Sequence, residues 1–335
     1  MIMCTAITLQ SMRGENFFGR TMDYSHDILP HMFTVPSGYV WNTLENQRMR
    51  DSYSFIGIGQ QLNGLLAFFD GVNENGFAAA ALYFAGYAMY SDIERSSPNT
   101  EKVATFDFLH YILGRCSSIE DLYTVVNGVS IIGNEDPVTN TVAPLHWIAT
   151  DKSGACVVME MTDNGFVMFQ NEIGVMANSP DFQWHMTNLR NYSQVSPEQT
   201  KEAMWGDICL KPFGQGAGTA LLPGGYTSPA RFVRTAYLKT HIPLPETKIQ
   251  AITSCFNIMK SVTIPKGAVV SERNTDDYTK YTAFIDTDTC EYYFNTYENQ
   301  QITKAILCKL PQSNHQLFDM GSIYLPVMIK SINAC

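Results

Sequence analysis

Runs of β-branched and aromatic residues, broken by turn-forming residues, fill the first 95 residues of the chain. The breaks carry turn signals such as Asn63-Gly64 and Asn73-Glu74-Asn75-Gly76, which separate segments of the length and composition typical of strands. This pattern predicts five strands, at Thr5–Leu9, Phe17–Met22, Tyr53–Ile58, Leu65–Phe69 and Phe77–Phe84.

Four helix signals follow further along the chain. Apolar residues at helical spacing mark the first, and two capping boxes and a proline after an N-cap serine mark the starts of the others. In chain order these signals lie at Thr105–Gly114, Ser117–Glu120, Ser228-Pro229 and Thr247–Gln250. Further strands are predicted within His146–Val175 and at Tyr281–Asp286, Cys290–Asn295 and Gln301–Cys308.

The alternation of strand blocks and helix blocks is the order expected of an α+β protein in which helices cover the outer faces of two sheets. The chain has 335 residues, and no Pro/Gly/Ser-rich linker long enough to divide it is present. We therefore expect a single domain.

Composition narrows the class of protein. Charged residues make up 16% of the chain and hydrophobic residues 45%, which excludes disorder as the main state. The net charge of −10 argues against nucleic acid or an anionic membrane as the main partner. The uncharged, largely apolar stretch Gly76–Tyr90 is shorter than the roughly 20 residues of a membrane span, and no secretory signal is visible.

The eight cysteines are scattered singly, without a C-x-x-C pair. In a chain of this length that pattern indicates reduced thiols and neither disulfide staples nor a zinc site. We therefore expect a cytoplasmic protein.

The first 23 residues carry the most informative chemistry. If Arg13-Gly14 is a two-residue hairpin loop, paired positions sum to 27, and Cys4 lies directly opposite Asp23. A thiol beside a carboxylate has no obvious packing purpose in a strand. In this register Arg20 lies on the opposite face, and it reaches the thiol only through a twist or a bulge, for which Gly19 is the natural place.

Two interpretations of Cys4 follow from its position alone. Cysteine is most often a small buried hydrophobe, and position by itself favours that interpretation. A cysteine at a chain terminus, in contrast, combines a nucleophile with a free α-amine, whose usual pKa near 7.7–8.0 suits a general base. A neighbouring arginine would favour the thiolate, and a nearby carboxylate could orient the amine.

Seven short motifs, in order along the chain, carry a family resemblance. They are M-C-T at 3–5, F-G-R-T-M-D at 18–23, D-G-V-N-E-N-G at 70–76, G-V-M-A-N-S-P at 174–180, W-H-x-x-N-L at 184–189, F-G-Q-G-A-G at 213–218 and S-P-A-R-F-V-R at 228–234. Together they closely resemble the choloylglycine hydrolase family, which contains penicillin V acylases and conjugated bile salt hydrolases. The match continues through the tyrosine- and asparagine-rich segment at 292–302 and so covers nearly the whole chain.

The resemblance implies a four-layer αββα sandwich of the N-terminal-nucleophile hydrolase type, with two antiparallel sheets between helix layers. It also implies hydrolysis of a linear, non-peptide amide through an acyl-enzyme, with no cofactor and no metal. The expected partners are a small acyl-amide substrate and further copies of the chain in a homotetramer. Neither nucleic acid nor membrane is expected.

Six residues take catalytic roles by position in this resemblance: Cys4, Arg20, Asp23, Tyr83, Asn178 and Arg231. The resemblance makes Cys4 the nucleophile and, through its amine, the base, with Arg20 stabilising the thiolate and Asp23 positioning the amine. Asn178 corresponds to the side-chain donor to the oxyanion, and Tyr83 falls where the family has a second contributor. Without the resemblance, Asn178 could be a turn residue, Tyr83 a core aromatic and Arg231 an exposed helical arginine.

Met1-Ile2-Met3 precedes Cys4, and an acylated nitrogen cannot act as a base. Either translation starts at Met3, or the three residues are a short propeptide that is removed autocatalytically. We expect an active form that spans residues 4–335.

The substrate prediction depends on Tyr83. Penicillin V acylases of this type carry tyrosine at this position, whereas bile salt hydrolases commonly carry asparagine. An aromatic wall suits an aryloxyacetyl group, so the sequence favours a penicillin V acylase that converts phenoxymethylpenicillin to 6-aminopenicillanate and phenoxyacetate. The alternatives are a conjugated bile salt hydrolase, an N-acyl-homoserine lactone acylase and a non-catalytic binder of acyl-amides.

Two other signals are interpreted as structural. The spacing of Asp23, His26, Asp27 and His31 fits no standard zinc pattern, which indicates a surface loop. His185 beside Trp184 lacks the cysteine signature of a papain-like pair and is expected to be a structural histidine on a helix.

Overall fold

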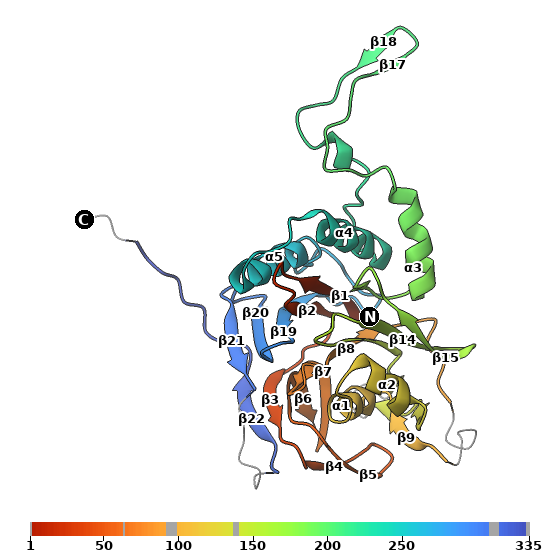
Figure 1. The fold of residues 1–335 in the computed structure, drawn as a ribbon, viewed down its shortest axis with the longest axis vertical. Helices are drawn as coiled ribbons and strands as arrows, with labels where there is room; N and C mark the ends of the chain where they lie inside the picture. Colours follow the sequence, from red (N-terminus) through yellow and green to blue (C-terminus); the bar gives the residue numbers. More distant parts are fainter. Residues whose placement is uncertain (1, 63, 92–98, 137–140, 308–314, 333–335) are drawn as a thin grey trace.

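The computed structural model describes residues 2–62, 64–91, 99–136, 141–307 and 315–332. Two antiparallel sheets stack face to face, and helices cover their outer faces (Figure 1). This is the four-layer αββα sandwich that the family resemblance implies, and the prediction of its fold class is confirmed.

The six-stranded sheet combines the first two strands of the chain with strands from its later part. Its order is β16 (Val175–Met176), β1 (Ile2–Gln10), β2 (Asn16–Tyr24), β19 (Tyr278–Asp286), β20 (Glu291–Thr296) and β21 (Thr303–Ile306). Helices α4 (Ser228–His241) and α5 (Lys248–Lys260) pack on this sheet through β1 and β19.

The eight-stranded sheet comes mainly from the first half of the chain. Its order is β15 (Gly165–Gln170), β14 (Cys156–Thr162), β13 (Leu145–Thr150), β8 (Ala78–Tyr83), β7 (Leu65–Asn73), β6 (Phe55–Leu62), β3 (His31–Val35) and β22 (Phe318–Ser322). Helix α1 (Asp107–Leu113) packs on β7 and β8, with α2 (Ile119–Val126) beside it (Figure 1).

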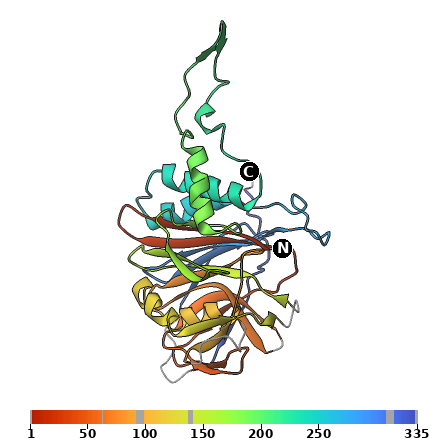
Figure 2. The ribbon, with the colours of Figure 1, turned by 90° about the vertical axis from the view of Figure 1, so that its right-hand side faces the viewer.

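The remaining elements are short. They are the strand pairs β4 (Val40–Asn42) with β5 (Arg48–Arg50), β9 (Glu101–Ala104) with β10 (Val129–Ile132), β11 (Glu135–Asp136) with β12 (Thr141–Val142) and β17 (Ala203–Trp205) with β18 (Ile208–Leu210), together with helix α3 (Phe182–Asn188) and the 3₁₀ turns Leu189–Tyr192 and Ala217–Thr219. The β17–β18 hairpin projects well away from the sandwich in both views (Figures 1 and 2).

Two cores hold the layers together. One lies between the two sheets and under α4 and α5, where Ile7, Ile148 and Phe284 are buried. The other lies between the eight-stranded sheet and the helices α1 and α2. Within the described ranges, no helix is both long enough and apolar enough to cross a membrane.

The predicted helix starts are right to within a residue or two. The capping box at Thr247 and Gln250 is present as predicted. Helix α2 is capped by Ser118, which accepts a hydrogen bond from the Asp121 N–H, and α4 is capped by Thr227, one residue before the predicted serine. The part of the last predicted strand beyond Leu307 lies outside the described residues.

The register of the β1–β2 hairpin differs from the prediction by one residue. Cys4 pairs with Met22, and Met3 pairs with Asp23, so paired positions sum to 26. The cause is the turn: the Ser11 N–H bonds the Glu15 carbonyl at 2.9 Å, which leaves a three-residue loop that ends at Gly14 in the left-handed region (φ 80°). Loops of two and of three residues both use a glycine in this conformation, so the sequence alone did not distinguish them.

Because successive residues of a strand alternate between faces, the one-residue shift moves the side chains of one strand to the opposite face relative to those of its partner. Arg20 pairs with Ala6, two residues from Cys4, so Arg20 and the thiol share the face turned toward the second sheet. The ladder is continuous from Ile2 to Gln10, and the bulge expected at Gly19 is wrong. Gly19 has a packing reason instead, because a Cβ there would lie 2.5 Å from the Phe284 ring.

Candidate active site

The Cys4 thiol lies between the two sheets and is fully buried. The Arg20 guanidinium donates to Cys4 Sγ at 2.7 Å, and Met22 Sδ is 3.9 Å from the same sulfur. Burial raises the pKa of the Cys4 thiol, while the positive charge of Arg20 acts in the opposite direction. The thiol therefore stays protonated at neutral pH in this form of the chain, and its attack requires a base.

A buried network fixes Arg20 from the second sheet. Its guanidinium bonds the Phe69 carbonyl at 2.9 Å and lies 3.4 Å from the Asp70 carboxylate. Asp70 also accepts from the hydroxyls of Tyr281, at 2.6 Å, and Tyr292. Burial raises the pKa of Asp70, and Arg20 opposes that shift. The sequence motifs gave no role to Asp70, Tyr281 or Tyr292, although Asp70 opens one of the family motifs.

Asp23 lies on the other face of the hairpin, where it accepts hydrogen bonds from Thr279 at 2.5 Å and Thr21 at 3.2 Å. Burial raises the pKa of Asp23 to about 6, against the effect of the nearby Arg231. With residues 1–3 in place, the Cys4 nitrogen is an amide, and its N–H donates to Asn178 Oδ1 at 2.7 Å.

Asn178 joins the two sheets at the site. It lies in the loop between β16 and α3, and its Nδ2 donates to the main-chain carbonyl of Tyr83, at the end of β8, at 2.8 Å. An amide nitrogen carries two hydrogens, so one remains for a further hydrogen bond. Asn178 is therefore more than the turn residue that its place before Ser179-Pro180 also allowed.

Arg231 is fully buried, and the alternative of an exposed helical arginine is wrong. Helix α4 directs its guanidinium to the Cys4 carbonyl at 2.5 Å, the Thr5 hydroxyl at 2.5 Å and Asn178 Oδ1 at 2.7 Å. Burial lowers the pKa of Arg231, and Asp23 acts in the opposite direction. The structure thus brings together all six residues that the resemblance selected.

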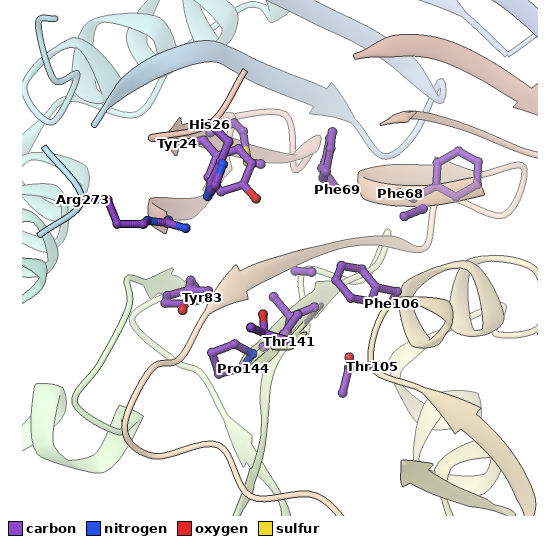
Figure 3. Close-up of a pocket in the computed structure, with 15 residues that line it drawn as sticks. Tyr24, His26, Phe68, Phe69, Tyr83, Thr105, Phe106, Thr141, Pro144 and Arg273 are labelled. Atoms are coloured by element: carbon purple, nitrogen blue, oxygen red, sulfur yellow. The ribbon is translucent and has the colours of Figure 1, made fainter. Parts of the chain in front are cut away.

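A cavity adjoins this cluster at Met22 and Tyr83 (Figure 3). Apolar and aromatic side chains form most of its wall. The lining residues are Met22, Tyr24, His26, Ala67, Phe68, Phe69, Ala81, Tyr83, Thr105, Phe106, Thr141, Ala143, Pro144, Leu145 and Arg273. Tyr83 is therefore a cavity residue and not a plain core aromatic, and its main-chain oxygen also contacts Asn178.

Asp23 and His26, two of the residues first interpreted as a surface loop, and His185, interpreted as a structural histidine, lie close to the site. Asp23 is in the cluster, His26 lines the cavity, and His31 bonds Asp319 at 2.9 Å. His185 is on helix α3, as predicted, but its Nε2 lies 2.8 Å from the Asn178 carbonyl oxygen. The W-H-x-x-N-L motif was the signal that could have drawn attention to this residue.

An αββα sandwich with a thiol, an arginine and an amide donor at one end of a cavity is an arrangement suited to amide hydrolysis. The family model for linear amide C–N hydrolases of the choloylglycine hydrolase family matches residues 4–317. The chain belongs to this family.

Named relatives cover almost the whole chain. A conjugated bile acid hydrolase of Lactobacillus gasseri is 32% identical over 89% of this chain and 93% of its own, and a bile salt hydrolase/transferase of Clostridium perfringens is 31% identical over 90% and 91%. A penicillin V acylase of Pectobacterium atrosepticum is 24% identical over 70% of this chain and 60% of its own.

Solved structures give the same order of similarity. A variant of the conjugated bile acid hydrolase from Clostridium perfringens has a TM-score of 0.90 at 27% identity over 98% of this chain and all of its own. The penicillin V acylase from Agrobacterium tumefaciens has a TM-score of 0.77 at 20% identity, over 97% of this chain and 94% of its own, and shares the fold.

Proposed function

We propose that this chain hydrolyses the amide bond of conjugated bile salts, with Cys4 as the nucleophile. The observation that carries the chemistry is the contact of Cys4 Sγ with Arg20, together with the hydrogen bond from the Cys4 N–H to Asn178. The relatives of higher identity and coverage support the substrate class, and the preference for penicillin V that Tyr83 suggested finds no support in them. One structural neighbour is a variant with an arginine replaced, and another is a variant with a cysteine replaced. The two replaced positions are as far apart in sequence as Cys4 and Arg20.

The catalytic steps follow from the geometry. The free Cys4 amine takes the thiol proton while Sγ attacks the substrate carbonyl carbon, and the second hydrogen of Asn178 Nδ2 meets the oxyanion. The C–N bond then breaks, the amine product leaves with the proton, and water hydrolyses the thioester. Asp23 holds the amine once it is free, and Tyr83 contributes to the oxyanion site.

The amine is free only after residues 1–3 have been removed. Because the Cys4 nitrogen is an acylated donor in the present chain, we propose that cleavage before Cys4 creates the active form, a single domain of residues 4–335. The match of the family model from residue 4 supports this boundary. The measurement is the intact mass of the purified active protein, and retention of Met1 or Met3 would contradict the proposal.

The cavity fits a conjugated bile salt in two respects. Its aromatic wall suits a large apolar acyl group. Arg273 is the only lysine or arginine among the described lining residues, and it faces the cavity near Tyr83 (Figure 3). A cation in this position suits an amide whose amine part ends in a carboxylate or sulfonate.

The decisive experiment compares kcat/KM for glycocholate, taurocholate, phenoxymethylpenicillin and an N-acyl-homoserine lactone. We expect the two bile salts to have the higher values. A clear preference for phenoxymethylpenicillin would overturn the substrate assignment while leaving the amidase chemistry intact. Binding of all four without turnover by the processed protein would favour the non-catalytic alternative.

We also propose that the chain is a cytoplasmic homo-oligomer. The projecting β17–β18 hairpin exposes Met204, Trp205 and Ile208, with Phe213 fully exposed beside it. Apolar side chains gathered on a projecting arm are typical of an interaction surface, and a second copy of the chain would cover them. Light scattering on a Trp205→Ser/Ile208→Ser variant should show a smaller assembly than the wild type, and an unchanged mass would contradict this role of the arm.

A further inference from the structure

The main-chain carbonyl of Asn178 is held by two side chains from different helices. His185 Nε2 lies 2.8 Å from this oxygen, and the Ser228 hydroxyl donates to it, also at 2.8 Å. His185 is on α3 and Ser228 is the first residue of α4, so both helices are tied to the same peptide group.

These contacts add to the hydrogen bonds of the Asn178 side chain. Its Oδ1 accepts from the Cys4 N–H and from Arg231, and its Nδ2 donates to the Tyr83 carbonyl. The side chain is thus aimed by three partners, while the main chain behind it depends on His185 and Ser228.

The environment of His185 makes it a fixed donor. The ring is buried and stacks on Phe232, with 4.6 Å between ring centroids. Burial lowers the pKa of His185 to about 4, so the ring is neutral at physiological pH. A carbonyl oxygen only accepts, which places the single hydrogen of the neutral ring on Nε2.

The other ring nitrogen argues against a role in proton transfer. Nδ1 is buried and has no hydrogen-bond partner among the described residues. A proton taken up there would create a charge in a buried site beside Arg231, whose own charge disfavours it. Among the described residues, the polar contacts of the His185 ring are therefore confined to Nε2, which donates to the Asn178 carbonyl and lies 3.4 Å from the Ser228 hydroxyl oxygen.

We propose that His185 and Ser228 are positioning residues that hold Asn178 Nδ2 where the oxyanion forms. This inference rests on the proposed function, since it takes Asn178 as the oxyanion donor. Without the two bonds, the peptide group after Asn178 can rotate and carry the amide away from the reacting atoms. A displacement of about 1 Å can cost on the order of 100-fold in rate.

The test compares variants that remove the donor with variants that keep it. His185→Met has similar bulk and no donor, whereas His185→Gln can donate from nearly the same place. We expect kcat to fall about 10- to 100-fold in His185→Met with little change in KM, and most of it to return in His185→Gln. Ser228→Ala should lower kcat in the same way, and Ser228→Thr should restore it.

Two controls are available at the far end of α4. Thr240 also donates to a main-chain carbonyl, that of Ala236 at 2.8 Å, and His241 stacks on Tyr237. Thr240→Ala and His241→Met should leave kcat unchanged. If His185→Met lowers the melting temperature and leaves kcat as in these controls, the residue is merely structural and the proposal fails.

A double-mutant cycle with Asn178→Ala separates this inference from the proposed function. Once the amide is gone, His185→Met should have little further effect on kcat. An undiminished kcat in Asn178→Ala would refute the oxyanion role itself. If Asn178→Ala lowers kcat strongly and His185→Met lowers it further by the same factor as in the wild type, only the positioning role is refuted. The positioning role is also refuted if the wild type shows an acidic limb in its pH profile that His185→Gln lacks.

Discussion

The inner face of the β1–β2 hairpin and the cavity beside it are built in opposite ways. On the hairpin face, Cys4 and Arg20 are fully buried, and every polar group is held by named partners. The cavity wall is mostly apolar and aromatic, and Arg273, its cation, is on an exposed loop. The hairpin face is set by the pairing of adjacent strands, whereas the cavity wall comes from segments between Met22 and Arg273 that are distant in sequence.

The difference separates reaction from substrate choice. A preorganised set of polar groups commits the site to one kind of bond cleavage. An apolar wall with a single charge discriminates weakly, because each added or missing apolar group changes binding by only a few kcal/mol. Substitutions on the hairpin face should therefore have larger effects than substitutions in the cavity.

The largest effect is expected at the nucleophile. Cys4→Ala should lower kcat/KM for taurocholate by at least about 1,000-fold, since it removes the covalent step. Mass spectrometry of the same variant should show residues 1–3 retained if Cys4 also cleaves its own leader, and Cys4→Ser, which keeps a weaker nucleophile, is the matched comparison. Full activity in Cys4→Ala would show that the hairpin face does not carry the reaction.

The next largest effect is expected from removal of Asp70, the carboxylate that contacts Arg20. Asp70→Ala leaves a buried guanidinium without its counterion, which costs about 3–5 kcal/mol in the free energy of unfolding. Tyr292→Phe removes one hydrogen bond to the same carboxylate and should cost about 1–3 kcal/mol. Urea unfolding measures both, and equal, small losses would show that the network is not needed to keep Arg20 in place.

The pH dependence should show an acidic limb. Asp23 must be ionised to hold the Cys4 amine, and with its pKa at about 6 kcat/KM should fall about tenfold per pH unit below that value. The amine freed by processing, when protonated, favours the ionised form of Asp23 and moves this limb to lower pH. Because the neutral amine is the proposed base, its own protonation adds a second acidic limb.

Stability should not follow the same limb. A buried acid whose pKa is raised in the folded state stabilises the fold below its unfolded pKa, and this contribution is lost as pH rises through about 6. Asp107 and Asp277, whose burial raises the pKa to about 6, act in the same direction. An activity loss near pH 5 that coincides with unfolding would contradict the role of Asp23.

The smallest effect is expected at the cavity cation. Arg273→Gln should raise KM for taurocholate about three- to tenfold with kcat unchanged, and the effect should shrink at high salt because the loop is exposed. Lys266, which lies over the Tyr278 ring from the same loop, is the matched control. An equal rise in KM for an uncharged amide would show that Arg273 does not recognise the anion.

The layers of the fold follow from the sequence pattern, because turn signals and helix caps are local. The register of the β1–β2 hairpin did not follow from the pattern, because Gly14 is compatible with a loop of either two or three residues. The candidate catalytic residues were selected through short motifs, but Asp70, Tyr281 and Tyr292 meet only in the folded chain. The substrate preference drawn from Tyr83 relied on one wall of a cavity whose other walls no local pattern reveals.

Surface turns ordinarily accept insertions and deletions, and the Met12–Gly14 turn is exposed on all three residues. This one is different, because adding or deleting a single residue would turn one strand inside out relative to the other. Arg20 would then leave the sulfur and enter the α4 side of the sheet. The number of residues in a solvent-facing loop, more than their identity, is thus a constraint that the chemistry imposes on how this gene can vary.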